Sequence, residues 1–283
     1  MTILWRKDTN MQLPNINKKR IVSLLKDGKR LNGRGNYDHR EIVIETNISN
    51  KAEGSARVRM GKTEVIVGIK LDTQEPYADH DDEGTLVVGM EFSSVAGDRY
   101  EPGPPKMDAI EIARVVDRGV RESGFIDWKK LCIKKGEKVW VINVDIYCIN
   151  DDGNAMDASA LATVAALQFT KFPVYDKKEE VVKFGEFTDE TLPLTANVPF
   201  TMTFYKVGDS LLLDPTREEE DASEARLSLA VSSPKKEKII NAMQKGGEVA
   251  LTAADLDEIV KHAEKAYDKI FPKIEKKIKE IMK

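Results

Sequence analysis

The chain has 283 residues, of which 41% are hydrophobic and 33% charged, enough for one large domain or two smaller ones with buried cores. Its 44 basic and 48 acidic side chains give a net charge of −4, which excludes attraction of the whole molecule to a polyanion and leaves nucleic-acid binding to a local basic patch. The sequence shows no run of about 18 apolar residues and no signal-peptide core, so we expect a cytoplasmic protein with no membrane partner.

The first elements in chain order are a helix and a set of strands. A helix is expected over residues 18–26, within an N-terminal helical extension of residues 1–31. Strands are expected over 41–49, 54–61, 63–71 and 85–96. Apolar residues alternate on both sides of Gly61-Lys62, which predicts an antiparallel hairpin with one buried face.

The next helix is predicted over residues 107–124, "MDAIEIARVVDRGVRESG". One side of this helix collects Ala109, Ile112, Val116, Gly119 and Val120, which should face the core. The opposite side collects Arg114, Arg118 and Arg121, which should form one exposed basic face. These arginines have two interpretations: they bind phosphates, or they form the surface ion pairs Glu111–Arg114, Asp117–Arg121 and Arg118–Glu122.

A strand over 138–150 with one apolar face then leads through a Gly-containing loop into a nearly all-apolar helix over 157–169. The charged stretch 175–193 favours a boundary, so we expect one domain over 32–175 and a second over 190–283. The second should hold three strands between residues 198 and 231, with turns at Gly208-Asp209 and near Pro215. A final amphipathic helix is expected over 254–282, with a bend at Pro272 and apolar positions at Val260, Ala263, Tyr267, Ile270, Ile274, Ile278 and Ile281.

Candidate metal and redox residues are sparse. Cys132 and Cys148 are expected to be reduced thiols, and His39, His80 and His262 have no second ligand at metal spacing. The acidic loop around residues 79–83 misses calcium-loop spacing. The acidic run 218–221 follows a turn and is interpreted as a solvated or partner-facing edge. We therefore expect no metal and no cofactor.

The loop before the apolar helix raises the main functional question. In "NDDGNAMDASALATVAAL", residues 150–167, a strand ends in a small loop and a helix leaves it, which is the geometry of an anion site at a helix N-terminus. The loop contains no Lys or Arg, and Asp151, Asp152 and Asp157 would place negative charge beside any bound anion.

This order of elements, together with "GSARVRMGKTEVIVGIK", "EPGPP", "EIARVVDRGVRES" and "LLLDPTREEED", resembles the RNase PH family, and within it the non-catalytic ring subunits of the archaeal exosome. The resemblance implies an α/β (α+β) RNase PH-like fold of the ribosomal protein S5 domain 2-like type, with two related halves of mixed sheet plus helices. It further implies a hexameric ring with a catalytic RNase PH-like sister subunit around a channel for single-stranded RNA, and RNA-binding cap subunits on that ring.

Active members of this family degrade RNA from its 3′ end by phosphorolysis, and the resemblance locates their site on this chain. Their phosphate loop carries Gly-Ser/Thr-Arg where this chain has Gly153, Asn154 and Ala155. Their RNA-gripping arginine pair falls at Met107 and Asp108.

Two further site aspartates of active members fall at Thr191 and Asn197. A shifted alignment recruits Asp189 but restores no arginine. The resemblance thus implies no catalytic residues and an RNA-binding role for Arg114, Arg118 and Arg121.

Three functions follow as alternatives. The first is a non-catalytic, RNA-binding and structural subunit needed by a catalytic sister for 3′-to-5′ phosphorolysis. The second is a phosphate-dependent exoribonuclease that acts alone through displaced residues. The third is a small-molecule enzyme that shares only the fold.

Overall fold

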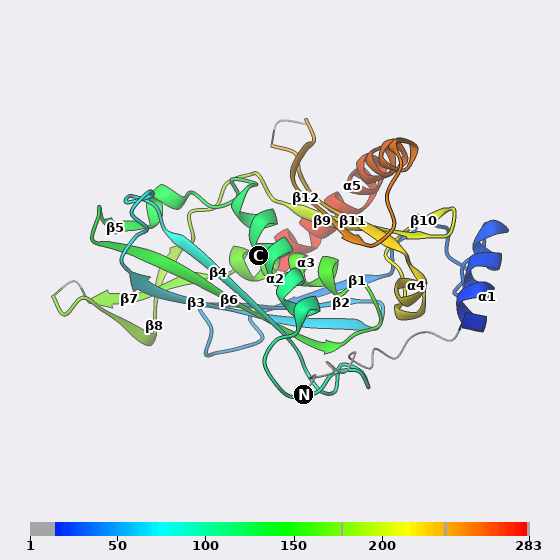
Figure 1. Ribbon diagram of the computed structural model, residues 1–283. Helices are drawn as coiled ribbons and strands as arrows, with labels where there is room; N and C mark the ends of the chain where they lie inside the picture. The colour runs from blue at the N-terminus through cyan, green and yellow to red at the C-terminus, as the bar shows by residue number, and fades with distance from the viewer. Residues whose placement is uncertain (1–14, 177, 235–236, 282–283) are drawn as a thin grey trace, which may run out of the picture.

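The computed structural model describes residues 15–176, 178–234 and 237–281 (Figure 1). It is a mixed α/β structure built around two sheets. The helices are α1 (Asn15–Lys26), α2 (Met107–Arg121), α3 (Ala155–Gln168), α4 (Arg217–Ala222) and α5 (Ala253–Ile281), with a 3₁₀ turn, η1, at Trp128–Leu131. No helix within the described residues is both long and apolar enough to cross a membrane.

The larger sheet has the strand order β1-β2-β3-β6-β4, with β5 also pairing with β6. The bounds are β1 Ile42–Thr46, β2 Gly54–Met60, β3 Thr63–Gln74, β4 Thr85–Phe92, β5 Cys132–Lys134 and β6 Lys138–Asn150. Only β4 runs parallel to β6; the other pairs are antiparallel. The predicted hairpin is confirmed, because Met60 pairs with Thr63 across a turn in which Gly61 has φ +60°.

Helix α3 lies between the two sheets. Every residue from Ala155 to Leu167 is buried, which confirms the enclosed helix expected from its composition. It packs on β2 and β3 of the larger sheet and on β9 of the smaller one. Beside it, α2 contacts β4 and β12 and buries the five apolar positions predicted for its inner side.

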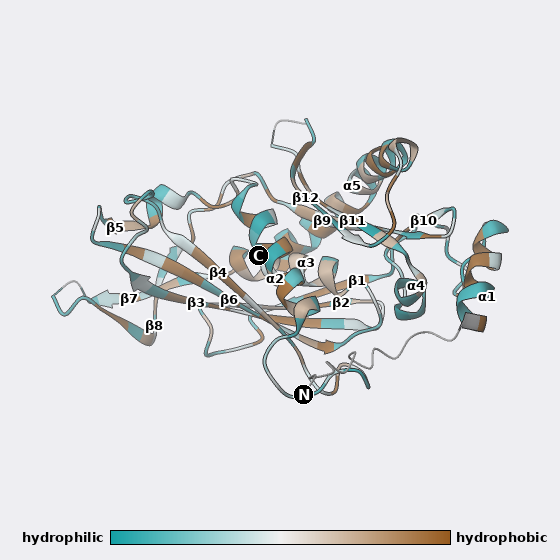
Figure 2. Cartoon of the chain, viewed as in Figure 1, coloured by the Kyte–Doolittle hydropathy of each residue, from teal (hydrophilic) through white to brown (hydrophobic). Residues whose placement is uncertain are grey.

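The smaller sheet has the order β10-β9-β11-β12 and is antiparallel throughout. Its strands are β9 Phe200–Val207, β10 Ser210–Leu213, β11 Ala225–Ser232 and β12 Ile239–Gly247. Helix α5 packs against β9 and β1 through Ile259, Ala263, Ala266, Tyr267, Ile274 and Ile278, and its apolar and polar sides are visible in Figure 2. Val260 and Ile281, expected on the inner side, are exposed instead.

Two parts of the second half differ from the prediction. The stretch 175–193, interpreted as a boundary, folds as an antiparallel ribbon of β7 (Lys171–Asp176) and β8 (Val181–Thr191). Strand β12 was not predicted. Residues on both faces of β8 are exposed, and β12 lies at a sheet edge, so neither strand shows the apolar alternation of a half-buried strand.

Candidate functional site

The loop between β6 and α3 has the shape of an anion cradle, but its backbone donors are occupied by this chain. The N–H of Asp152 donates to Thr63 Oγ1 (3.2 Å) and the N–H of Gly153 to Asp151 Oδ1 (3.0 Å). The N–H of Asn154 donates to Glu220 Oε2 at 2.7 Å. A carboxylate from α4 therefore binds the amide at which a helix N-terminus would receive phosphate.

Glu220 belongs to the acidic run 218–221, which was predicted to be a solvated or partner-facing edge. Glu218 is exposed, but Glu219 is buried and Glu220 and Asp221 are partly buried, so a solvated edge is wrong for these three. Arg217 forms ion pairs with Asp151 (2.9 Å) and Asp221 (2.7 Å). Arg99, from the Pro-rich loop before α2, adds two hydrogen bonds to Asp221, at 3.0 and 2.6 Å. Glu220 and Asp221 are turned inward because these arginines provide charge-assisted partners for their carboxylates.

A second cluster holds the loop from its other side. Arg40 donates to the carbonyl oxygens of Asp152 and Gly153, both at 2.9 Å, and pairs with the buried Asp214 carboxylate at 2.7 Å. The Asn154 amide nitrogen also donates to Asp214 (3.1 Å). Burial alone would raise the pKa of Asp214, but the neighbouring His39 and the Arg40 guanidinium outweigh it and hold this pKa well below its usual range.

Asp157 differs from its predicted role as a charge beside an anion. It lies in the first turn of α3, fully buried against β9, where its two oxygens accept hydrogen bonds from Thr203 N (2.9 Å) and Thr203 Oγ1 (2.7 Å). Burial raises the pKa of Asp157 to about 7 despite these donors. Asp157 thus connects α3 to the second sheet, and with this pKa it is only partly ionised at neutral pH.

The other positions expected from active family members lie at the start of α2, on β8 and in the loop after β8. Met107 and Asp108 begin α2 and are exposed. Thr191 ends β8 and is exposed, and the N–H of Asn197 donates to Thr195 Oγ1 at 3.1 Å. Asp189 is also exposed on β8 and lies 3.7 Å from Lys171.

The three arginines of α2 differ in the contacts that they make. Arg121 pairs with Asp117 (2.6 Å), donates to the carbonyl of Leu86 (3.0 Å) and stacks over Trp128. Arg118 donates to Gln244 of β12. Arg114 is exposed and has no hydrogen bond or ion pair to any described residue.

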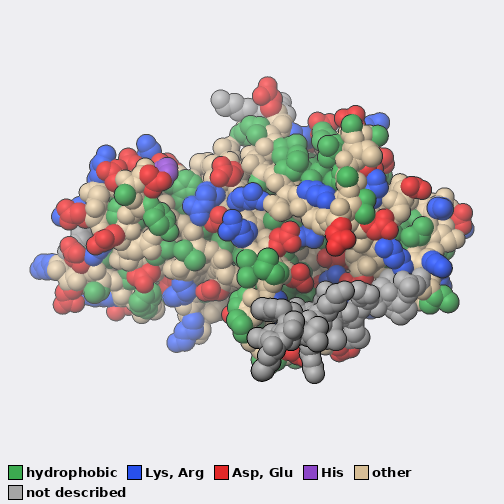
Figure 3. All heavy atoms as spheres, in the orientation of Figure 1, with side chains coloured by type: hydrophobic (Ala, Val, Ile, Leu, Met, Phe, Trp, Pro, Cys, Tyr) green, Lys and Arg blue, Asp and Glu red, His purple; other side chains and the backbone are tan. Residues whose placement is uncertain are grey.

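Of the three alternative surface ion pairs, only Asp117–Arg121 is formed within the described chain. Glu111 pairs with Arg226 at 2.6 Å rather than with Arg114. Lys and Arg side chains gather over and beside α2 on the face seen in Figure 3. Arg114 and Arg118 therefore remain available for an anionic ligand, whereas Arg121 is committed to the fold.

We expect this difference to appear in stability. Arg121→Ala should lower the free energy of unfolding by about 1–2 kcal/mol, because it removes a charge-assisted hydrogen bond, an ion pair and an aromatic contact. Arg114→Ala should change it by less than about 0.5 kcal/mol, since an exposed helix position accepts alanine. Urea denaturation of both variants checks this; equal losses would show that Arg114 has a structural partner.

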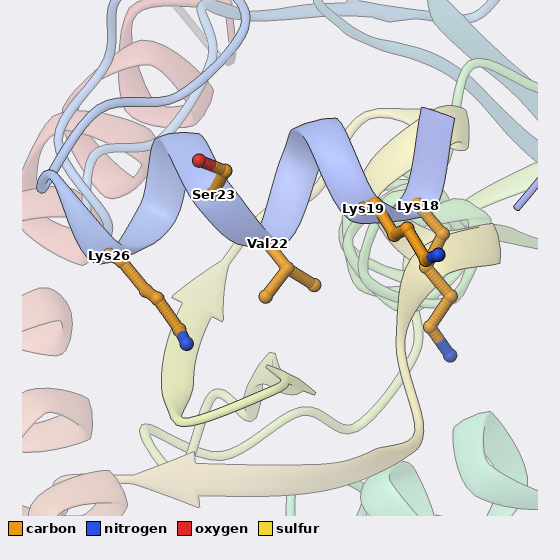
Figure 4. A pocket seen from close by; sticks show the side chains of 5 residues that line it. All are labelled: Lys18, Lys19, Val22, Ser23 and Lys26. Atoms are coloured by element: carbon orange, nitrogen blue, oxygen red, sulfur yellow. The ribbon is translucent and has the colours of Figure 1, made fainter. Parts of the chain in front are cut away.

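A further basic surface lies on α1, for which the sequence predicted only a helical extension. Lys18, Val22 and Lys26 extend from one side of the helix over a groove of about 440 Å³ (Figure 4). Lys18 pairs with Glu224 at 3.2 Å. Four basic and no acidic residues within α1 were the signal available in the sequence.

Comparison with known proteins agrees with this architecture. The model of domain 1 of the 3′ exoribonuclease family matches residues 38–173, and that of domain 2 matches residues 197–266. The chain belongs to this family. Its members have the RNase PH fold, as the sequence resemblance implied. The matched segments contain the larger sheet with α2 and α3, and the smaller sheet with α4 and the first half of α5.

Individual relatives are similar over most of their length. The chain is 44% identical over 249 residues to "Exosome complex component Rrp42" of Methanosarcina mazei, covering 88% of this chain and 89% of that one. To the protein of the same name from Archaeoglobus fulgidus it is 42% identical over 248 residues, covering 88% and 92%.

Solved structures show the same likeness. A chain of "archaeoglobus fulgidus exosome with RNA bound to the active site" superposes with a TM-score of 0.82 at 39% identity, covering 92% of this chain and 98% of that one. A chain of "Archaeal exosome core" gives 0.80 at 37% identity, covering 92% and 97%. Rice Rrp46, at 15% identity and a TM-score of 0.64, shares the fold over 88% of this chain and 100% of its own.

Proposed function

We propose that this chain is a structural, RNA-binding subunit of an archaeal exosome and has no phosphorolytic activity of its own. Relatives 44% and 42% identical are named as components of the exosome complex, and the superposed structures are exosome assemblies. Its partners in this proposal are a catalytic RNase PH-like sister in a hexameric ring, RNA-binding cap subunits and single-stranded RNA. The compartment is the cytoplasm.

One observation supports the absence of activity most strongly: Glu220 accepts the Asn154 N–H at 2.7 Å in the former phosphate loop. Phosphorolysis needs a dianionic nucleophile held by cations and backbone donors beside the RNA end. Here the loop donors are paired within the chain, and Met107 and Asp108 stand where active members carry arginines. Phosphate would have to displace Glu220 and enter beside Asp151.

The RNA-binding part of the proposal rests on α2. Arg114, Arg118 and Arg121 follow one another along the helix, and Arg114 and Arg118 present guanidinium groups that the fold leaves exposed. Guanidinium groups at this spacing can bind successive phosphates without reading bases. Arg121 contributes charge from a position fixed by Asp117 and Leu86.

The salt dependence of RNA binding tests this surface. The wild-type chain and the Arg114→Ala/Arg118→Ala variant are assembled with the sister subunit, and their affinity for single-stranded RNA is measured between about 50 and 200 mM salt. Each lost phosphate contact should flatten the slope of log K against log[salt] by about 0.7, so the variant should lose about 1.4.

Arg57→Ala/Arg59→Ala provides the matched control. These two arginines lie on β2 and pair with Glu45 at 3.2 and 2.9 Å. The control should leave the slope unchanged. An unchanged slope in the α2 variant with an intact ring would remove α2 from the RNA interface, and failure of the wild-type chain to join the sister would remove the structural role.

A further inference from the structure

A small cavity of about 280 Å³ opens at the start of α2, between the loop 93–106, β4 and β6. Its walls include Glu91, Glu101, Asp108, Tyr147 and the ring pair Phe92–Tyr100. Ligand clefts for drug-sized molecules usually exceed about 300 Å³, so this cavity is sized for part of a larger partner, such as one side chain.

The cavity has an excess of negative charge. Glu91, Glu101 and Asp108 line it, and within the described chain none of them forms a salt bridge. Of the two basic residues in its walls, Arg99 is committed to Asp221 through two hydrogen bonds, at 3.0 and 2.6 Å. Lys106 alone remains, so the cavity favours a cationic occupant.

The side chains that line the cavity indicate which kind of cation would bind there. Phe92 and Tyr100 are stacked with centroids 4.2 Å apart and planes within 1°, and Tyr147 is 44% exposed nearby. A guanidinium group is planar, stacks on aromatic faces and donates to several carboxylates at once, whereas an ammonium group is a compact point charge. Separated carboxylates beside aromatic side chains therefore suit an arginine better than a lysine.

Exposed apolar residues next in sequence to the lining residues indicate that the cation belongs to a protein. Val95 follows Ser94 and Met107 precedes Asp108, and each is 75% exposed; Ile110, which follows Ala109, is 41% exposed. Hydrophobic side chains also gather at the lower end of α2 in Figure 3. Exposed apolar side chains beside an acidic pocket are typical of a protein interface, where an arginine is a common anchor.

We propose that the cavity at the start of α2 is a docking pocket for an arginine side chain of a neighbouring protein subunit. The proposal deepens the proposed function, on which it rests for the identity of the neighbour, the RNase PH-like sister.

The test removes the negative charges of the cavity and keeps the size of the side chains that carry them. The variant Glu91→Gln/Glu101→Gln/Asp108→Asn should bind the sister subunit at least tenfold more weakly than the wild type in analytical ultracentrifugation, because a buried arginine would lose its carboxylate partners. The control Glu186→Gln/Asp189→Asn/Glu190→Gln changes the net charge equally on the exposed strand β8 and should bind within twofold of the wild type. Equal affinities of variant and control would overturn the proposal.

A second measurement does not depend on assembly. N-acetyl-arginine amide is titrated into the full wild-type chain while the ring resonances of Tyr100 and Tyr147 are followed by NMR, with spermidine and MgCl₂ in parallel. Saturable shifts with the arginine compound that vanish in the triple variant support the pocket. No shift, or the same shifts with spermidine or Mg²⁺, would overturn it, whereas a wild-type chain that binds the arginine compound but not the sister would refute the proposed function alone.

Discussion

Replacing Asp214 with alanine is expected to lower the free energy of unfolding by about 3–5 kcal/mol, the usual consequence of leaving buried charges without their partner. Asp214 is fully buried and accepts hydrogen bonds from the Arg40 backbone N–H (2.7 Å), the Arg40 guanidinium (2.7 Å) and Arg34 (3.0 Å). The Arg40 and Arg34 side chains are only 8% and 16% exposed, so neither can be rehydrated without rearrangement.

Two further variants, Asp214→Asn and Asp209→Ala, are compared with Asp214→Ala. Asparagine also tolerates the φ of +50° found at residue 214, so Asp214→Asn isolates the loss of charge. The free energy of unfolding of this variant should lie between those of the wild type and of Asp214→Ala. Asp209 is exposed in the β9–β10 turn, and its replacement should cost less than about 0.5 kcal/mol. Denaturant unfolding measures all three, and a cost for Asp214→Ala equal to that of Asp209→Ala would show that the cluster does not join the two halves.

Replacing Gly153 with alanine is expected to cost about 2–4 kcal/mol, combining left-handed backbone strain with overpacking. Gly153 has φ +88°, and a Cβ there would lie 2.5 Å from the Thr216 carbonyl carbon and 2.6 Å from the Arg217 nitrogen. Those atoms are backbone and cannot rotate away. The loop and the turn before α4 would have to separate, which would also break the Asn154–Glu220 hydrogen bond.

Gly185 is the matched control for this substitution. Its φ is +89°, but a Cβ there meets no described atom within 4 Å. Gly185→Ala should therefore cost only the conformational term, about 1 kcal/mol. The difference between the two variants in thermal or urea unfolding measures the contact between the loop and α4, and equal costs would contradict the close packing.

Helices and strands were predicted well where burial imposes a periodic pattern of apolar residues. Strand β6 has its predicted bounds, Lys138–Asn150, and α3 starts two residues before its predicted start, because alternating or continuous apolar residues reflect the layers around them. The ribbon β7–β8 was missed because its exposed residues need no such period. The resemblance to the RNase PH family, confirmed by both domain models, supplied the topology that local patterns do not contain.

The sequence predicts which residues the site lacks, but it does not predict which side chains occupy their place. The missing loop arginine can be read directly at Asn154 and Ala155. That Glu220 binds the Asn154 N–H could not be predicted, because the two residues are 66 positions apart and acidic runs are usually solvated. The partners of Arg118 and Arg121 depend in the same way on β12 and β4, which approach α2 only in the fold.

If this chain supports phosphorolysis without performing it, phosphate-dependent release of nucleoside diphosphates from single-stranded RNA should depend on the sister subunit. The assay compares the pure chain, the pure sister subunit, and the two mixed. We expect no release by the pure chain and more release by the mixture than by the sister alone. Phosphate-dependent release by the pure chain would contradict this expectation.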